Sequence, residues 1–453
     1  MEKDLTKGSV FGNVVRFSLP YLLSYFLQTL YGMADLFIVG QFEGAASTTA
    51  VSVGSQVMHM ITVMIVGLAM GTTVSIGQAV GAGNKKRARL ATGNTVTLFL
   101  CISAVLTAVL LLCVSPIVSV MSTPEEAVEG TKAYITVCFI GIPFITAYNI
   151  ISSIYRGLGD SKTPMYFIAV ACVANIALDY LFMGYFAMGP TGAALGTTLS
   201  QALSVVISLV AMRRKKDGIK PEKGDFSPNG DVMREILKVG VPIALQDGLI
   251  QIAFIVITVI ANKRGLTDAA AVGIVEKIIS FVFLVPSSLL STVSALGAQN
   301  IGAKKYGRAD KTLGYAVLIA VIFGSVVSVL MQFFAADAVG CFQNDPEVVA
   351  AGAEYLKGYI WDCIFAGIHF SFSGWFCACK KSYISFVHNI TAIALVRIPG
   401  VWLMSRRFPD TLFPMGLATA CGSFVSAVIC VAAFIAVVQK RKKTAVGISP
   451  CGD

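Results

Sequence analysis

Acidic and amide side chains lie inside segments of this chain that are otherwise apolar. Asp35 stands in LYGMADLFIVG with no basic residue beside it, and Asp179 stands in ANIALDYLF. Asn175 precedes Asp179 by four residues, so that on a helix the two side chains share one face. A charge at the centre of a bilayer costs about 2.5–3.5 kcal/mol on insertion scales. Each carboxylate therefore has to face a polar cavity or stay protonated.

The chemistry that suits these groups is the binding of a proton or a hard cation. Two carboxylates in one cavity of low dielectric resist joint ionisation, so such a pair can hold a proton near neutral pH. The same oxygens can bind a dehydrated sodium ion, which prefers carboxylate, amide and hydroxyl ligands. A purely structural interpretation stays open, in which Asp35 pairs with a distant lysine or backbone group and Asn175 makes an ordinary interhelical hydrogen bond.

The second half of the chain carries further intramembrane polar residues. We interpret four of them as candidate cavity-lining residues of a C-terminal lobe, namely Asp247, Gln251, Glu276 and Asp362. Glu276 and Lys277 can equally be neighbours near the end of a span, and His369 is typical of a packed polar residue. Arg397 is an isolated base in its span. In the first span, Pro20 removes a backbone hydrogen bond, and we interpret it either as a gating bend close to Asp35 or as a tolerated membrane-helix proline.

Composition assigns the chain to the membrane proteins. Of 453 residues, 56% are hydrophobic and 13% are charged, and the mean hydropathy is +0.76. Crossing a hydrocarbon core of about 30 Å takes about 20 helical residues. We therefore expect an all-α membrane protein with about twelve transmembrane helices, near 14–40, 48–77, 92–118, 131–155, 164–187, 191–212, 234–261, 269–298, 311–336, 350–377, 384–404 and 411–438.

The basic residues indicate a topology rather than a nucleic-acid partner, although the net charge is +10. Most of them lie in alternate loops, which is the positive-inside pattern when both termini are cytoplasmic. We expect a multi-pass protein of the cell inner membrane, with lipid as its surroundings, no nucleic acid bound and a monomeric state. The first residues contain no cleavable signal peptide, so we expect the first span to act as the insertion signal.

The sequence lacks the motifs of several functional classes. The sequence has no G-x-x-x-x-G-K-[ST] phosphate loop, no spacing typical of a zinc or haem site, and no identifiable pair of nucleophile and base. Eleven cysteines, mostly within apolar runs, indicate no disulfide framework. We therefore expect no enzyme activity, no cofactor and no metal beyond a sodium ion at the coupling site, and we expect transport to be driven by an ion gradient of sodium or protons.

An internal repeat divides the chain into two similar halves. QAVGAGNKKRAR from Gln78 matches QNIGAKKYGRAD from Gln299, and the segment around Pro20 matches the segment around Pro242. An even number of spans in each half gives a parallel repeat, whose two lobes form a central cleft and rock to give alternating access. We expect an N-terminal six-helix lobe at 1–212, a cytoplasmic linker at 213–232, a C-terminal six-helix lobe at 233–439 and a cytoplasmic tail at 440–453.

These features together resemble the multidrug and toxic compound extrusion family over nearly the whole chain. The resemblance is carried by Pro20 and Asp35 in the first helix, both copies of the repeated loop, YRGLGDSKTP from Tyr155, the N-x-x-x-D motif at Asn175 and TGAALGTT from Thr191. It implies a V-shaped bundle of twelve helices that exports organic cations or other xenobiotics in exchange for sodium ions or protons. It also implies that the cation site consists of Asp35, Asn175, Asp179 and Thr197, with Pro20 as the bending residue.

The second half departs from one branch of that family. A glutamate that this branch carries in its seventh helix would fall on Ile250, beside Gln251, and Arg156-Gly157 faces Cys377-Ala378 in the repeat. A second ion site in the C-terminal lobe therefore stays an open question. The intramembrane carboxylates favour a lipophilic cation as the small-molecule cargo, because carboxylates and aromatic rings both attract such cations. Two alternatives remain: a lipid-linked precursor flippase of the same superfamily, which should carry basic residues in its cleft, and a channel or membrane scaffold.

Overall fold

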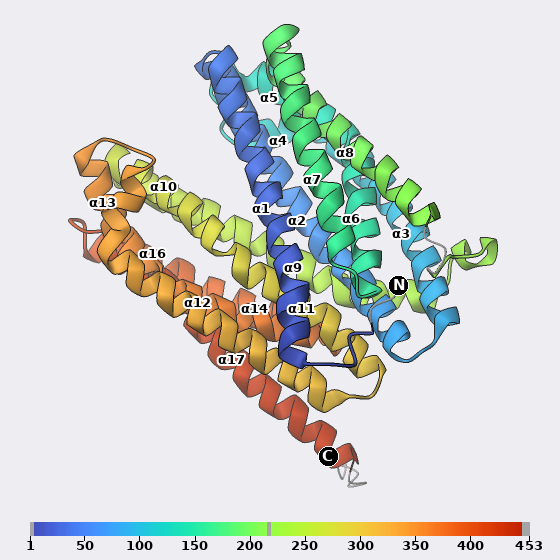
Figure 1. Cartoon of the computed structure of the whole chain (residues 1–453). Helices are drawn as coiled ribbons and strands as arrows, with labels where there is room; N and C mark the ends of the chain where they lie inside the picture. The colour runs from blue at the N-terminus through green and yellow to red at the C-terminus, as the bar shows by residue number, and fades with distance from the viewer. Residues whose placement is uncertain (1–3, 215–218, 446–453) are drawn as a thin grey trace. The chain divides into compact units, whose positions relative to one another are not determined.

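The computed structural model describes residues 4–214 and 219–445, and every regular element in this part of the chain is a helix (Figure 1). Helices are expected here because hydrocarbon offers the backbone no hydrogen-bond partner, so each segment has to satisfy its own N–H and C=O groups. The elements of the first half are α1 (Val10–Phe42), α2 (Ala45–Gly81), α3 (Lys85–Leu112), α4 (Val114–Val120), α5 (Glu125–Ile140), α6 (Ile142–Gly157), α7 (Lys162–Asp179), the π-helical segment η1 (Tyr180–Tyr185) and α8 (Gly189–Arg214).

The second half follows a similar order of elements. A short 3-10 turn, η2 (Lys223–Phe226), precedes it. Its helices are α9 (Gly230–Asn262), α10 (Leu266–Val282), α11 (Leu284–Gly302), α12 (Tyr306–Gly340), α13 (Pro346–Tyr359), α14 (Asp362–Ala378), α15 (Tyr383–Ala392), the π-helical segment η3 (Ile393–Arg397), α16 (Ile398–Arg407) and α17 (Phe413–Ala445). The pair α10 and α11 takes the place of α2, and the single helix α12 takes that of α3 and α4.

The predicted fold class, an all-α membrane protein, is confirmed. Ten helical stretches in the described residues are long and apolar enough to cross a bilayer, and the pair α5 and α6, bent by 47°, makes an eleventh. The span predicted at 350–377 consists of two shorter helices, α13 and α14, which meet at Ile360 and Trp361. Many large apolar side chains are exposed along these helices, including Leu100, Leu112 and Phe333, as a lipid-facing surface requires.

The repeat predicted from sequence has structural counterparts. Both α1 and α9 contain an internal proline, Pro20 and Pro242, and both run through it without a break. The break between α5 and α6 at Gly141 corresponds to the break between α13 and α14. The equivalent helices α7 and α15 are each followed by a π-helical segment. The two halves therefore share their internal proline, their helix break and their π-helical segment as well as their helices.

Two compact units make up the structure, and their limits differ from the two sequence halves. Unit 1 contains 1–248 and 295–309, and unit 2 contains 249–294 and 310–453. The start of α9 and the second copy of the repeated loop thus belong to unit 1. The domain limits drawn from the sequence stay a prediction. Positions 215–218 of the predicted linker and 446–453 of the predicted tail lie outside the described residues, as do residues 1–3.

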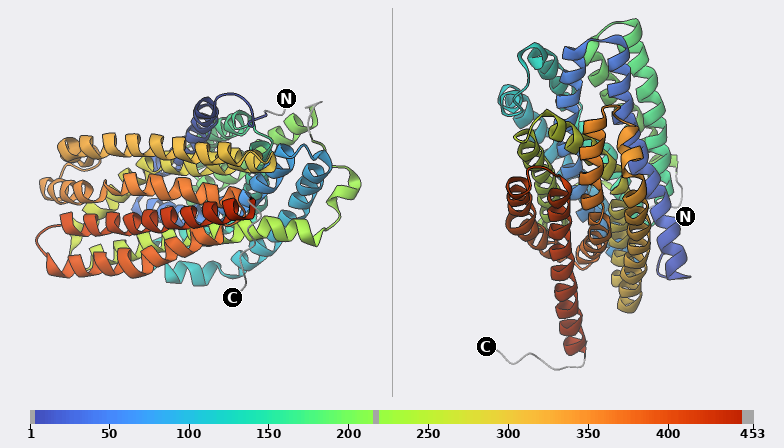
Figure 2. Two further views of the ribbon diagram at one scale, coloured as in Figure 1. Left: turned by 90° about the horizontal axis from the view of Figure 1, so that it is seen from below. Right: turned by 90° about the vertical axis from the view of Figure 1, so that its left-hand side faces the viewer.

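Within each unit the helices pack along their length. In unit 1, α7 lies between α1 and α8, while α2 packs against α5 and α6 (Figure 1). In unit 2, α17 packs against both α13 and α14, and Figures 1 and 2 show α14 and α17 running alongside each other. Each unit has its own apolar core, built around Tyr134 and Phe139 in unit 1 and around Tyr355 and Tyr359 in unit 2.

The segment before α1 is tied to the second copy of the repeated loop. Lys305 Nζ donates to the carbonyl oxygen of Thr6 at 2.9 Å, and Arg308 Nη1 donates to that of Gly8 at 3.0 Å. Gln299 accepts from the backbone N–H of Leu5 at 3.2 Å through its Oε1. These charge-assisted and amide hydrogen bonds fix the start of the helix that carries Asp35.

Reciprocal glycines bring the two copies of the repeated loop together. A Cβ built on Gly81 would lie 1.9 Å from the carbonyl oxygen of Gln299, and one built on Gly302 would lie 2.1 Å from that of Gln78. No side chain fits at either distance, so glycine is required at both positions for this backbone contact.

Replacing Gly302 by valine should therefore destabilise unit 1. The added side chain forces α2 and α11 apart, and overpacking of this kind costs about 1–3 kcal/mol or more. We expect a lower apparent melting temperature of the purified protein in detergent. Gly307→Ala is the control, because a Cβ there meets nothing within 4 Å. Equal melting temperatures for the two variants would contradict the close contact.

Candidate cation-binding site

Asp35 lies deep in unit 1, on α1, with a side chain from α8 as its hydrogen-bond donor. The residue is 2% exposed. Thr197 Oγ1 donates to Asp35 Oδ2 at 3.0 Å. Of the two partners that a purely structural role allows, a lysine or a backbone group, no lysine forms an ion pair with Asp35 among the described residues. A hydroxyl is the group that faces this carboxylate.

Asn175 connects Asp35 and Thr197 to the second carboxylate. Its Nδ2 lies 3.5 Å from Thr197 Oγ1 and 3.5 Å from Asp179 Oδ1, and Asp179 is completely buried. The Asp35 and Asp179 carboxyl groups are close enough to act on each other electrostatically. The structure thus brings together all four residues that the resemblance implies, from α1, α7 and α8.

Three oxygens of this group have no hydrogen-bond donor among the described residues. They are Asp35 Oδ1, Asp179 Oδ2 and Asn175 Oδ1. A buried acceptor without a donor costs about 1–3 kcal/mol, and more when it is charged. A proton held between the carboxyl groups, or a hard cation bound by the oxygens, removes that cost. These oxygens can bind either ion, and no nitrogen or sulfur atom is among them.

Gly196 makes room for Asp179 and was not identified from the sequence. A Cβ at this position of α8 would lie 2.0 Å from Asp179 Oδ1. The Asp179 carboxylate therefore lies directly against the α8 backbone, one residue before Thr197. The signal for it was present in the small-residue run TGAALGTT, because a glycine inside a membrane helix often marks a close approach.

The helix that carries the motif changes its hydrogen-bond pattern at Asp179. α7 ends at this residue and the π-helical segment η1 follows directly. Single π turns within helices are frequent at functional sites, since they widen the helix and free carbonyl groups locally. Sequence periodicity gives no sign of this change, because η1 is as apolar as the rest of the span.

Pro20 and Asp247 lie elsewhere in unit 1. Pro20 is buried within α1, where its carbonyl oxygen accepts from Ser24 Oγ at 2.8 Å, and its role as a gate stays a prediction. Asp247, on α9, packs against α2, with its Oδ2 2.8 Å from the position of a Cβ on Gly67. In the part of the chain that the structure describes, no hydrogen bond or ion pair joins Asp247 to Asp35.

Unit 2 pairs two of its buried charges, Arg397 and Asp362, with each other. Arg397 Nη2 lies 3.6 Å from Asp362 Oδ2, and the same nitrogen donates to the Tyr359 hydroxyl. The guanidinium also stands over the rings of Phe254 and Tyr359, at 5.4 and 5.6 Å from their centroids. The sequence singled out Asp362 and Arg397 but did not predict that they form a pair.

The other predicted residues of the second half are more dispersed. Glu276 Oε2 accepts from Thr258 Oγ1 at 3.1 Å, while Lys277 is exposed. Gln251 is half-buried on α9. His369 is buried and its ring lies 5.5 Å from that of His388, a residue not identified from the sequence. The structure therefore forms a compact oxygen-rich site in unit 1, whereas the predicted polar residues of unit 2 are dispersed apart from the pair of Asp362 and Arg397.

Comparison with known proteins identifies relatives along the whole chain. The chain is 29% identical over 427 residues to the probable multidrug resistance protein YpnP of Bacillus subtilis, covering 93% of this chain and 96% of the relative. It is 27% identical to the probable multidrug resistance protein YoeA of the same organism, covering 88% of each. It is 24% identical to the multidrug export protein MepA of Staphylococcus aureus, covering 89% of each.

Solved structures share the fold at lower identity. A crystal structure of MATE in complex with MaL6 superposes with a TM-score of 0.91 at 22% identity, covering 97% of this chain and 99% of the other. A MOP superfamily transporter from Pyrococcus furiosus gives the same score and identity, with 98% of it covered. The MatE family model matches residues 20–181 and 242–403, one match in each half. The chain is therefore a multi-pass membrane protein that belongs to the MatE family of multidrug efflux transporters.

Proposed function

We propose that this protein is a secondary active antiporter that exports organic cations, drugs or other xenobiotics in exchange for sodium ions or protons by alternating access. The observation that supports it best is the buried group of Asp35, Asn175, Asp179 and Thr197 with its three oxygens that lack a donor. An ion that enters this group from one side of the membrane and leaves on the other supplies the free energy for export.

The coupling ion and the cargo follow from the same chemistry. Two carboxylates beside an amide and a hydroxyl suit a proton or a sodium ion. When that ion leaves, the group regains negative charge in a low dielectric, where a lipophilic cation is the matching cargo. The flippase alternative has no comparable support, because Arg397, the base buried within a unit 2 span, is already paired with Asp362.

Charge distribution supports an inner-membrane location with both ends in the cytoplasm. Most of the basic residues lie at one set of helix ends, such as Arg213 and Arg214 at the end of α8 and Lys442 and Lys443 at the end of α17. Lys/Arg-rich connections stay on the cytoplasmic side during insertion. We expect a monomer as the functional form.

Asp35→Asn should abolish gradient-driven export while leaving the protein folded. Asparagine keeps the shape and the contact with Thr197 but removes the charge that binds the ion. The measurement is ethidium efflux from proteoliposomes under an imposed sodium gradient or proton gradient. Asp337→Asn is the matched control, because Asp337 is an exposed acid on α12. Export by Asp35→Asn at the wild-type rate would remove Asp35 from the mechanism.

Asp179→Asn should weaken the dependence of export on the driving ion. It leaves Asp35 and Thr197 in place but removes the second carboxylate of the pair. We expect the ion concentration for half-maximal efflux to rise by about tenfold or more, since a lost hydrogen bond or contact to a charged group costs about 1.5–3 kcal/mol. An unchanged ion dependence would exclude Asp179 from the site.

Gly196→Ala should reproduce part of that defect without changing any polar group. The new methyl group would occupy the place of Asp179 Oδ1, so the carboxylate has to move away from the α8 backbone. The measurement is again the ion dependence of efflux, with Gly314→Ala on α12 as the control, because a Cβ there meets nothing within 4 Å. A wild-type ion dependence in Gly196→Ala would show that the position of Asp179 does not matter.

A further inference from the structure

We propose that unit 2 carries a binding site for the phosphate headgroup of an anionic phospholipid, at the end of α16. The site consists of Lys263, Arg406 and Arg407, which we call the basic rim. It is an exposed surface at the edge of the membrane rather than a cavity. It does not depend on the coupling ion or on the cargo of the transporter.

The two arginines of the basic rim lie at the end of a membrane span. The span runs over Tyr383–Arg407, and Arg406 and Arg407 belong to the last turn of α16. About one turn earlier, Trp402 and Leu403 are 46% and 52% exposed. Tryptophan is typical of the boundary between hydrocarbon and headgroups, and an arginine at a helix end reaches into the headgroup layer. The end of α16 therefore lies at headgroup level.

Basic residues at this end of unit 2 run against the usual charge pattern. α17 begins at Phe413, shortly after Arg407, and its 33 residues extend about 50 Å to the turn that holds Lys442 and Lys443. Figure 1 shows α16 at the end of unit 2 that is remote from the C-terminus. In the topology proposed above this end is the outer one, where lysine and arginine are disfavoured. The arginines there need a role of their own.

Arg264 brings the third cation of the basic rim to the same edge. It lies in the turn between α9 and α10, and its guanidinium donates to the carbonyl oxygens of Ser405 at 2.7 Å and Pro409 at 2.8 Å. Its Nε donates to Asp268 at 2.6 Å, so its own charge is neutralised. The turn that carries Lys263 is thus fastened to the turn that follows α16.

The three cations of the basic rim have no acidic partner among the described residues. All three are exposed and none of them forms an ion pair. Two acids of this end are already engaged, because Asp268 pairs with Arg264 and Glu354 accepts from the Thr411 hydroxyl. Asp410 is exposed in the turn after α16 and offsets one of the three charges. An excess of positive charge remains for a ligand from outside the chain.

An aromatic ring holds one guanidinium of the basic rim in place. The Cζ atom of Arg406 lies 4.2 Å from the centroid of the Trp402 ring. A guanidinium stacked on a ring keeps its N–H groups in its own plane, where they can donate in pairs to a phosphate. Because the group is already positioned, less side-chain entropy is lost when the phosphate binds.

Charge and apolar surface together select the ligand. The phosphate of a phospholipid meets the basic rim, while its acyl chains pass the exposed side chains of Trp402 and Leu403. A zwitterionic headgroup brings its own ammonium beside the phosphate and gains less from these cations. A headgroup of the phosphatidylglycerol type has no ammonium, and each basic residue near the surface favours an anionic lipid by about fivefold.

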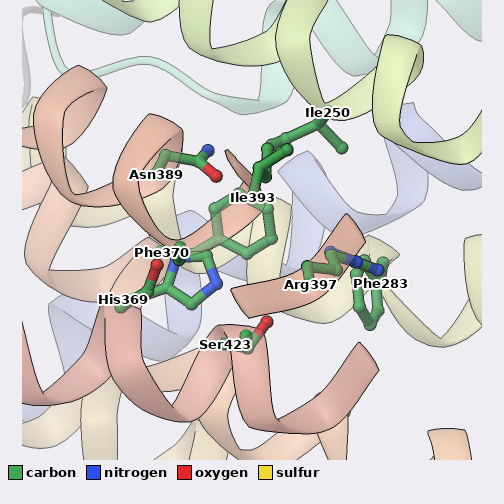
Figure 3. A pocket seen from close by; sticks show the side chains of 11 residues that line it. Ile250, Phe283, His369, Phe370, Asn389, Ile393, Arg397 and Ser423 are labelled. Carbon is green, nitrogen blue, oxygen red and sulfur yellow. The ribbon is translucent and has the colours of Figure 1, made fainter. Parts of the chain in front are cut away.

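The other arginine of this span has a different setting. Figure 3 shows Arg397 beside a pocket that His369 and Ser423 also line. That cavity of about 20 Å³ has room for about one water molecule, and Asp362 lies 3.6 Å from the guanidinium. Arg397 is therefore buried and paired, and the arginines open to a lipid headgroup are those at the end of α16.

The test measures which lipid lies beside Trp402 in the reconstituted full chain. Tryptophan fluorescence is recorded in phosphatidylcholine bilayers that contain a rising share of phosphatidylglycerol with brominated acyl chains, which quench on contact. Brominated phosphatidylcholine is the reference lipid, and subtracting the signal of Trp402→Phe isolates the quenching at Trp402. We expect phosphatidylglycerol to bind beside Trp402 about tenfold or more strongly than phosphatidylcholine.

Arg407→Gln and Lys263→Gln should each lower that preference by about three- to fivefold. Each removes one cation and leaves the contact of Arg406 with Trp402 in place. Lys311→Gln is the matched control, because Lys311 is an exposed lysine in the first part of α12, and it should keep the wild-type preference.

Three outcomes would overturn the proposal. The same preference in wild type, Arg407→Gln and Lys263→Gln would show that the basic rim does not select the lipid. Equal quenching of wild type by the two brominated lipids would show that no anionic lipid is preferred beside Trp402. Loss of the preference when millimolar inorganic phosphate replaces chloride at constant ionic strength would show that the basic rim takes a free anion.

Discussion

The burial of two carboxylates among membrane-spanning helices is the constraint on which the site in unit 1 depends. Among the described residues no base pairs with Asp35 or Asp179, and the hydrogen bonds that these carboxylates accept come from the Thr197 hydroxyl and the Asn175 amide. α1, α7 and α8 have to meet within hydrogen-bonding distance for even these contacts to form. Gly196 allows that approach, because α8 presents bare backbone to Asp179. An arrangement that leaves acidic oxygens without donors is stable only when a proton or cation completes it.

The two halves share an architecture but differ in how they neutralise buried charge. Both carry a proline inside the first helix, a break in the fourth span and a π-helical segment, η1 or η3, in the fifth span. In unit 1 the π segment follows an aspartate that lacks a base. In unit 2 it contains Arg397, which pairs with Asp362. Because unit 2 supplies its own counter-charge, we propose that ion coupling belongs to unit 1.

Hydropathy and the repeat were sufficient to predict the class of fold and its internal duplication. The spacing of Asn175 and Asp179 placed both on one helix face, and the resemblance added Thr197 and joined the three to Asp35. Sequence patterns did not predict the distances between helices. The pairing of Arg397 with Asp362 joins residues on α14 and η3, and nothing local distinguishes a glycine that touches a carboxylate from one that faces lipid.

The most direct test of ion coupling at this site is the release of an ion when a cationic substrate binds. Tetraphenylphosphonium is added to purified protein in weakly buffered detergent solution, while proton and sodium activities are recorded together. We predict that wild type releases protons or sodium ions in proportion to the bound substrate, and that Thr197→Val, which removes the hydroxyl donor to Asp35, releases fewer. Substrate binding with no release of either ion from wild type would contradict coupling at Asp35 and Asp179.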